Sequence, residues 1–275
     1  MCQTSYALAI PVLSKRIVNG FLITNELGSS AISVFKATAG GLYGCGGTLI
    51  SPNHVLTAAH CVVEGKDVIV PAANMTIGYN DYDRAQQKLG KVRNITVHPE
   101  YFSQGQDGIA DIAIMEIDDL AEAADFNQRV PIYDGPIGNN QSMLAVGWGN
   151  TEDSADNLLS LRGVVVISGN QALCGTFSNA YVNNNGPQIC APGALAPFHS
   201  TCSGDSGSGL LINYNGALMV AGVVSTALNI GDTECGNPNG VHMFVHASYY
   251  MDFIMENTGL SKEYLTGLTD ASESV

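Results

Sequence analysis

Short runs of apolar residues recur along most of the chain, and polar or glycine-rich segments separate them. Many of these runs are rich in β-branched and aromatic residues, which favour strands, and turn-forming residues bound them. The runs are GGTLIS, HVLTAAH, NITVH, DIAIMEI, SMLAVGW, RGVVVIS, GLLINY and ALMVAGVVS. The pattern therefore predicts an all-β protein.

One segment near the C-terminus departs from this pattern. Ala247, Tyr250, Met251 and Ile254 follow the i, i+3, i+4, i+7 spacing of one helix face. We therefore expect a C-terminal helix that packs through this face. The residues at 261–275 are small, polar and acidic, and we expect them to form a flexible tail.

A polar stretch with two prolines, residues 127–140, separates two halves of similar size. A chain of 275 residues is long enough to bury a large core. We expect residues 17–135 to form a first β unit, and residues 136–260 to form a second β unit together with the helix.

The composition suits a soluble β-rich protein, with 45% hydrophobic residues, 13% charged residues and 31 glycines. The formal net charge of -14 disfavours nucleic acids and anionic membranes as partners. No apolar run reaches the roughly 18 residues that a membrane helix needs. Residues 6–13 are apolar but lack a basic start and a clear cleavage site, so they resemble at most a remnant of a signal peptide.

Seven cysteines occur without any CxxC pair, which disfavours a structural zinc site and favours three disulfides with one odd cysteine. Glycosylation sequons begin at Asn74, Asn94 and Asn140. Both features are typical of an oxidising secretory compartment. We therefore expect a secreted, extracellular glycoprotein with no metal site and no cofactor. Cys2 has no obvious partner, and a free thiol, a link to another chain and removal with a signal peptide all stay open.

The segment TCSGDSGSGL, residues 201–210, places Ser206 beside a lone acid among glycines. A flexible turn is one interpretation, and a nucleophile loop is the other. A nucleophilic serine needs a base, and the base needs a third group to orient it. His60 in LTAAHC and Asp111 at the start of DIAIMEI provide these groups. The order His, Asp, Ser differs from that of α/β-hydrolases, and Ser208 occupies the last glycine of their GxSxG motif.

These motifs, together with RIVNG, CGGTLIS and GWGNT in the same order, resemble the trypsin-like (chymotrypsin-fold) serine endopeptidases from Ile17 to about Asn257. The resemblance implies two six-stranded antiparallel β-barrels and a C-terminal α-helix. It also implies that Ser206 attacks the scissile carbonyl, that His60 is the general base and then the general acid, and that Asp111 orients His60. The oxyanion hole would consist of the backbone N–H groups of Gly204 and Ser206.

Asp205, next to the nucleophile, would be a buried carboxylate that requires a cation, and no lysine or arginine lies near it in the sequence. The resemblance implies that cleavage after Arg16 frees the amino group of Ile17, which then pairs with Asp205. Residues 1–16 are therefore interpreted as a pro-segment or the remnant of a signal peptide, and the chain as a zymogen.

The resemblance further implies a specificity pocket with Ser200 at its floor and Thr201, Ser225, Ala227 and Gly240 along its walls. This pocket would be neutral and mostly apolar, so we expect a preference for large uncharged side chains before the cut. Polypeptide substrates and protein inhibitors of proteases are the expected partners, and the protein is expected to be a monomer. The implied disulfides are Cys45–Cys61, Cys174–Cys190 and Cys202–Cys235.

Two alternatives stay open beside the endopeptidase hypothesis. A non-catalytic relative would keep the fold as a binding module, but such proteins usually lose a triad residue, and this chain keeps all three together with Gly204 and Asp205. An esterase of the GDS type is suggested by Gly204-Asp205-Ser206 alone. That class carries its motif near the N-terminus and has no comparable histidine before it.

Overall fold

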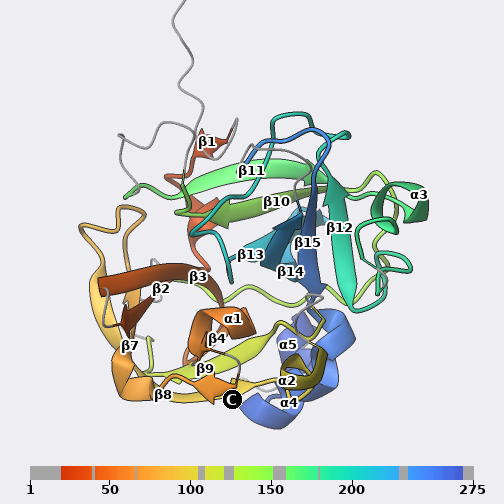
Figure 1. Cartoon of the computed structure of the whole chain (residues 1–275). Coiled ribbons are helices and arrows are strands. Elements are labelled where there is room, and N and C mark those ends of the chain that lie inside the picture. The colour runs from red at the N-terminus through yellow and green to blue at the C-terminus, as the bar shows by residue number, and fades with distance from the viewer. Residues whose placement is uncertain are drawn as a thin grey trace, which may run out of the picture.

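The computed structural model describes residues 20–38, 41–65, 67–104, 109–120, 127–150, 159–178, 180–228 and 235–268. Most of the regular structure in these ranges is β-strand, and the helices are short. Apart from the two-residue strand β1 and a small hairpin, the strands form two groups, one from each half of the sequence, that lie one above the other in Figure 1. The all-β fold class is therefore confirmed.

The first half forms a closed antiparallel barrel in the strand order β2-β3-β4-β9-β8-β7. Closure leaves no edge strand, because β7 pairs with β2 as well as with β8. Ile32 and Val34 of β2 are buried and belong to the apolar core. A separate small hairpin joins β5 (Val63–Glu64) to β6 (Val68–Ile69). The barrel strands are β2 (Ala31–Thr38), β3 (Gly41–Ser51), β4 (His54–Thr57), β7 (Met75–Tyr79), β8 (Lys88–Val97) and β9 (Ala113–Ile117).

The second half forms six further antiparallel strands, and the two-residue strand β1 (Phe21–Leu22) joins their edge beside β11. The complete order is β1-β11-β10-β13-β14-β15-β12. Just beyond β11, the Gly169 N–H donates to the Cys190 carbonyl of β12 at 2.8 Å, which links the two ends of the six-strand group. The six strands are β10 (Ser142–Gly147), β11 (Arg162–Ile167), β12 (Gln188–Pro192), β13 (Gly209–Tyr214), β14 (Ala217–Leu228) and β15 (Val241–His246).

The expected C-terminal helix is present as the 3₁₀ turn η5 (Ser248–Tyr250) followed by α4 (Met251–Thr258). All four residues of its predicted apolar face are buried. It follows β15 of the second sheet but lies beside the first barrel (Figure 1). There the ring centroids of Phe253 and His98 are 4.9 Å apart. The other short helices are η1 (Glu26–Gly28), α1 (Ala59–Val62), η2 (Ala72–Asn74), α2 (Tyr101–Gln104) and α3 (Gln171–Cys174).

Part of the expected flexible tail is helical, contrary to the sequence-based expectation. Helix α5 (Lys262–Thr266) begins after Ser261, whose hydroxyl accepts a hydrogen bond from the Tyr264 N–H, and ends at Gly267 with a φ of 72°. Leu265 is only 1% exposed, so the helix docks on the core. The rest of the expected tail, from 269 onward, lies outside the described residues.

One large apolar cluster extends across both groups of strands. It contains most of the barrel core and residues of the second sheet such as Val146, Val220 and Val245. Because close-packed cores resist deformation, this shared core holds the two groups of strands, and the loops between them, in a fixed relative position. Among the described residues, no helix is long and apolar enough to cross a bilayer. The unit boundaries at 17–135 and 136–260 stay predictions.

Candidate active site

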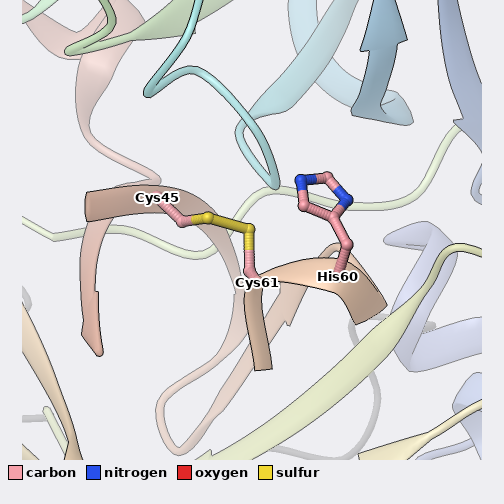
Figure 2. Close-up of side chains that lie close together, drawn as sticks. All are labelled: Cys45, His60 and Cys61. Atoms are coloured by element: carbon pink, nitrogen blue, oxygen red, sulfur yellow. A yellow bond between two sulfur atoms is a disulfide. The ribbon is translucent and has the colours of Figure 1, made fainter. Parts of the chain in front are cut away.

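His60 lies on α1, which follows β4 and occupies the space between the two groups of strands (Figure 1). The Cys45–Cys61 disulfide ties α1 to β3 directly beside it (Figure 2). Cys45, His60 and Cys61 are residue types that bind metals and they lie together. Both sulfurs are consumed by the disulfide, however, so neither is available as a thiolate ligand. The cluster therefore fixes the position of the histidine.

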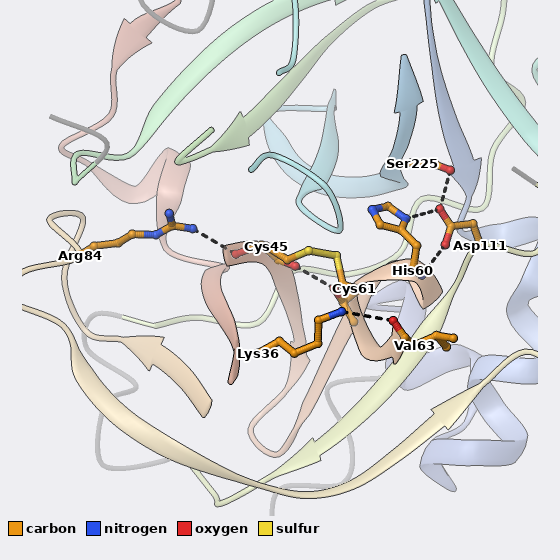
Figure 3. The surroundings of a disulfide bond; sticks show 10 residues. Lys36, Cys45, His60, Cys61, Val63, Arg84, Asp111 and Ser225 are labelled. Carbon is orange, nitrogen blue, oxygen red and sulfur yellow. Dashed lines mark hydrogen bonds and ion pairs between the residues drawn. A yellow bond between two sulfur atoms is a disulfide. The ribbon is translucent and has the colours of Figure 1, made fainter. Parts of the chain in front are cut away.

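Asp111 makes three hydrogen bonds that aim it at His60 (Figure 3). Its Oδ2 lies 2.8 Å from His60 Nδ1 and accepts a 2.6 Å hydrogen bond from the Ser225 hydroxyl. Its Oδ1 accepts a 2.9 Å hydrogen bond from the His60 N–H. Asp111 is 2% exposed, so the carboxylate is held with its partners away from water.

The two groups shift each other's protonation. Burial would raise the pKa of Asp111, but the His60 charge and the hydrogen bonds from His60 and Ser225 hold that pKa below its ordinary value. Burial would likewise lower the pKa of His60, yet the Asp111 carboxylate outweighs burial and raises that pKa above 6.5. The arrangement stabilises an imidazolium when His60 accepts a proton, which is what a general base requires.

The backbone just before Asp111 is held in an uncommon conformation. Ala110 has a φ of +54° and is fully buried. Its N–H donates to the hydroxyl of Tyr250, 2.9 Å away, at the start of α4. Non-glycine residues with positive φ persist only where their surroundings hold them. The C-terminal helix therefore contributes to the position of the acid.

The loop that carries Ser206 is fixed by backbone contacts to both groups of strands. The Gly46 N–H of β3 donates to the Ser206 carbonyl at 2.8 Å, and the Gly207 N–H donates to the Val224 carbonyl of β14 at 2.8 Å. Gly207 has a φ of +80°, and a side chain there would collide with Thr57 and with the Gly46 carbonyl. In Figures 2 and 3 the loop that leads into β13 ends beside the imidazole. The Ser206 hydroxyl itself makes no hydrogen bond to His60 in the described structure, and such contacts often tighten only with substrate.

Gly204 adopts a backbone conformation that favours glycine. Its φ is +97°, and a side chain there would lie 3.1 Å from the Gly149 Cα, so glycine fits best. Within the described ranges, neither its N–H nor that of Ser206 has an internal acceptor. Two such donors on one turn can bind a developing oxyanion.

Asp205 is 1% exposed, and its carboxylate accepts hydrogen bonds from the backbone N–H groups of Gly149 and Cys202 at 2.7 and 2.8 Å. Burial raises its pKa to about 6, and these hydrogen bonds and the charge of Arg84 only partly offset that effect. Arg16 and Ile17, the predicted activation residues, lie outside the described residues, as does Cys2.

The predicted pocket residues occupy different surroundings. Ser200 is fully buried and its hydroxyl donates to the Thr201 carbonyl at 2.5 Å. The Thr201 hydroxyl lies 3.1 Å from Nδ1 of His242, which pairs with Ala227 across β14 and β15. The Gly240 carbonyl accepts from the Gly193 N–H at 2.8 Å. The Ser225 hydroxyl, by contrast, donates a hydrogen bond to Asp111.

Two residues near the site escaped the sequence analysis. His242 lies behind Thr201, and burial lowers its pKa to about 4, so it is neutral at neutral pH. Arg84 lies in the segment between β7 and β8 and influences Asp205. Neither belongs to a quoted motif, and only the fold brings them to the loop. The three disulfides join the implied cysteines: Cys45–Cys61, Cys174–Cys190 and Cys202–Cys235.

Comparison with known proteins identifies the family of the chain. The family model described as Trypsin matches residues 23–254. Chymotrypsin-like elastase family member 1 of Homo sapiens is 30% identical over 251 residues, which cover 89% of this chain and 93% of that protein. Trypsin of Phaedon cochleariae is 31% identical over 220 residues, 78% of each chain. The chain belongs to the trypsin family of serine endopeptidases.

Proposed function

We propose that this endopeptidase uses Ser206, His60 and Asp111 as a catalytic triad and becomes fully active after cleavage behind Arg16. The observation that carries the proposal is the buried Asp111 carboxylate, which contacts both Nδ1 and the backbone N–H of His60. This contact selects the tautomer in which Nδ1 carries the proton and Nε2 is available as the base.

The first half of the reaction forms an acyl-enzyme. Nε2 of His60 takes the proton of the Ser206 hydroxyl as Oγ attacks the scissile carbonyl carbon. The N–H groups of Gly204 and Ser206 then stabilise the negative charge on the former carbonyl oxygen. His60 returns its proton to the leaving amine, and the C–N bond breaks.

In the second half, water replaces the amine. His60 takes a proton from the water as its oxygen attacks the acyl carbon, and the same two N–H groups stabilise the second oxyanion. His60 then protonates Ser206 Oγ as the bond between Oγ and the acyl carbon breaks, and the product leaves with a new carboxyl group. The original proton of Ser206 has left on the amine and a proton from water has replaced it, so the enzyme is regenerated.

The pocket is proposed to accept large uncharged side chains. Its candidate floor contains the hydroxyl of Ser200, and His242 behind Thr201 is neutral at neutral pH. No carboxylate from these residues is available to pair with lysine or arginine. A panel of peptides that differ only before the cut tests this proposal, and strong preference for Arg or Lys would contradict it.

The protein is further proposed to be a secreted monomer that acts on polypeptides and is open to protein inhibitors. Three disulfides support an oxidising compartment. The sequon residues Asn74, Asn94 and Asn140 are all exposed, as glycosylation requires. Glycosylation is tested by treating the protein with an endoglycosidase, which should lower its mass by the mass of the released glycan. Asn→Gln variants at the three sequons are the controls.

A fluorophosphonate probe tests the triad and its activation together. The chain is expressed with and without Arg16→Gln, treated with a trypsin that is then removed, and exposed to the probe. Rapid labelling of Ser206 only in the cleaved chain, and none with Ser206→Ala, is expected. N-terminal sequencing of the labelled protein should begin at Ile17.

The alternative of a non-catalytic binding module predicts the opposite result. A cleaved, folded chain that never reacts with the probe would favour it over the triad. The intact contacts among His60, Asp111 and Ser225 argue for the enzyme, because a binding module has no use for an oriented base.

A further inference from the structure

Arg84 is a partly buried cation that the proposed mechanism does not use. Its Nη2 donates to the Cys45 carbonyl at 3.1 Å (Figure 3). Its Nε donates to the Ser33 hydroxyl, also at 3.1 Å. Its Cζ lies 5.4 Å from the Phe35 ring and 5.2 Å from the Trp148 ring. Contacts at the edges and faces of the guanidinium fix it in one position.

The segment that carries Arg84 is anchored to both groups of strands. The Arg84 N–H donates to the Leu159 carbonyl at 2.7 Å, just before β11. Trp148, which follows β10, donates from Nε1 to the Tyr82 carbonyl at 2.9 Å. The cation is therefore held where the first barrel meets the second sheet.

Asp205 contacts the same segment that contacts Arg84. The Gly149 N–H donates to its carboxylate, and a side chain on Gly149 would lie within 2.6 Å of both carboxylate oxygens. A side chain on Gly147 would also collide with it. Residues 147–149 therefore contact both charged groups. Gly147 and Gly149 lie against Asp205, and the Trp148 ring lies against Arg84.

Arg84 and Asp205 attract each other without forming a direct ion pair. Burial lowers the pKa of Arg84 to about 10, and Asp205 opposes that shift, so the guanidinium is protonated at neutral pH. Among the described residues, Arg84 is the cation that lowers the pKa of Asp205. Charges separated by protein interior are less screened than charges at the surface.

We propose that Arg84 is a positioning residue for the nucleophile loop, and that its charge stabilises the ionised form of Asp205 from within the folded chain. The proposal rests on the proposed function of that loop. It means that Asp205 has a resident cation before cleavage releases the amino group of Ile17. The turn at 202–207 then depends less on processing than a loop with no such cation.

A second contact connects Arg84 to the nucleophile itself. The carbonyl of the Cys45–Gly46 peptide accepts from Arg84, and the N–H of the same peptide donates to the Ser206 carbonyl. Hydrogen bonds in series polarise one another. This contact does not require a charge on Asp205, so an experiment must separate it from the electrostatic role.

A double-mutant cycle on urea unfolding makes this separation. The cycle uses the full, uncleaved chain with Arg16→Gln, and it combines Arg84→Met with Asp205→Asn at pH 7.5. We expect Arg84→Met to lower the urea midpoint. When Asp205→Asn is present, we expect Arg84→Met to lower the midpoint by at most roughly half as much. An equal loss in both backgrounds would overturn the proposal, because packing and the Cys45 contact would then explain it.

Labelling of the cleaved chain provides the functional test. We expect Arg84→Met to slow fluorophosphonate labelling of Ser206 by roughly tenfold, and Arg84→Lys, which keeps the charge, to recover most of the rate. The control is Arg93→Met, which removes an equal charge from an exposed pair with Asp118. Equal rates for Arg84→Met and Arg93→Met, or no recovery with lysine, would overturn the proposal.

The two proposals fail in different ways. If the cleaved wild type is not labelled at all, the proposed catalytic function is wrong. Coupling of the urea midpoints would still support stabilisation of Asp205 by Arg84 in that case. If the wild type is labelled and the midpoints are uncoupled, the catalytic function stands and the role of Arg84 is overturned.

Discussion

Two buried carboxylates lie near Ser206, and their pKa values move in opposite directions. Asp111 has the imidazole of His60 and the hydroxyl of Ser225 in direct contact, and its pKa is lowered despite burial. Asp205 has two backbone N–H donors, with Arg84 beyond contact distance, and burial raises its pKa to about 6. Hydrogen bonds alone therefore do not compensate for the loss of water around Asp205.

The difference fits the two roles proposed for these carboxylates. A carboxylate that orients a base has to stay charged, so its partners are built into the folded chain. We propose that Asp205 gains the Ile17 amino group as a second cation only on cleavage, and until then it is the less stabilised of the two. The following predictions test this contrast, from the largest expected effect to the smallest.

Asp111→Asn removes the carboxylate that has the lower pKa of the two. We expect turnover to fall by about four orders of magnitude, because His60 loses both its orientation and the stabilisation of its charged form. Activity in the wild type should rise with pH as His60 loses its proton, with a midpoint above 6.5 because its pKa is raised. The midpoint should be lower in the variant.

The pH dependence of kcat/KM measures both effects. Asp118→Asn is the matched control, since its carboxylate is 44% exposed and pairs with the exposed Arg93. An unchanged midpoint in Asp111→Asn would show that this carboxylate does not set the pKa of His60.

Gly204→Ala disturbs the loop next to Asp205. The added methyl would meet Gly149 at 3.1 Å in a backbone conformation with a φ of +97°. We expect kcat to fall by roughly a hundredfold to a thousandfold, since one donor of the oxyanion would move. KM should change little.

Steady-state kinetics on a chromogenic peptide checks this expectation against Gly216→Ala. Gly216 also has a positive φ, of +88°, but no atom lies within 4 Å of the added methyl. Its substitution should reduce stability without lowering kcat. Equal losses of kcat in the two variants would argue against an oxyanion role for Gly204.

Asp205 should make the uncleaved chain less stable as pH rises. Its folded pKa of about 6 lies above the ordinary value of 3.8, so folding favours the protonated form. That contribution to stability is complete below the ordinary value and is lost as pH rises through the folded value. The shift corresponds to about 3 kcal/mol in the free energy of unfolding.

Urea unfolding of Arg16→Gln between pH 4 and pH 7.5, with and without Asp205→Asn, isolates this term. The difference between the two chains should change with pH. It should change less in chains that keep Arg16 and have been cleaved, because their new amino group is expected to lower the pKa of Asp205. A difference independent of pH would contradict a raised pKa.

Ser225→Ala sharpens the contrast with the smallest change. Asp111 would lose a 2.6 Å hydrogen bond but keep both contacts with His60. We expect kcat/KM to fall by roughly tenfold, the value of one hydrogen bond to a charged group. Ser103→Ala, which removes an exposed hydroxyl, should leave kcat/KM unchanged.

The candidate triad could be predicted from the sequence because each of its residues lies in a short motif, and the structure brings two of them, His60 and Asp111, into contact. His60, Asp111 and Ser206 each stand in a distinctive local context, and their chain order separates this family from other hydrolases. The apolar face at residues 247–254 likewise follows from periodicity alone. Local patterns of this kind depend on neighbours within a few positions, which a single sequence displays.

What the sequence did not predict depends on contacts between distant segments. No lysine or arginine lies near Asp205 in the chain. Arg84 and Asp205 are neighbours of the same segment, 147–149, only because the segment after β7 packs against the segment after β10. In the sequence, nothing distinguishes His242 from other strand residues. Only its pairing with Ala227 across β14 and β15 places it near the predicted pocket. The α5 helix was missed because five residues give too little periodicity, although Ser261 and Gly267 were readable caps.

The hydrogen bond between Ala110 and Tyr250 joins residues separated by 140 positions. The backbone next to Asp111 is therefore held in part by a residue from the far end of the chain. A truncation that removes the C-terminal helix should release this clamp even though His60 and Asp111 both remain.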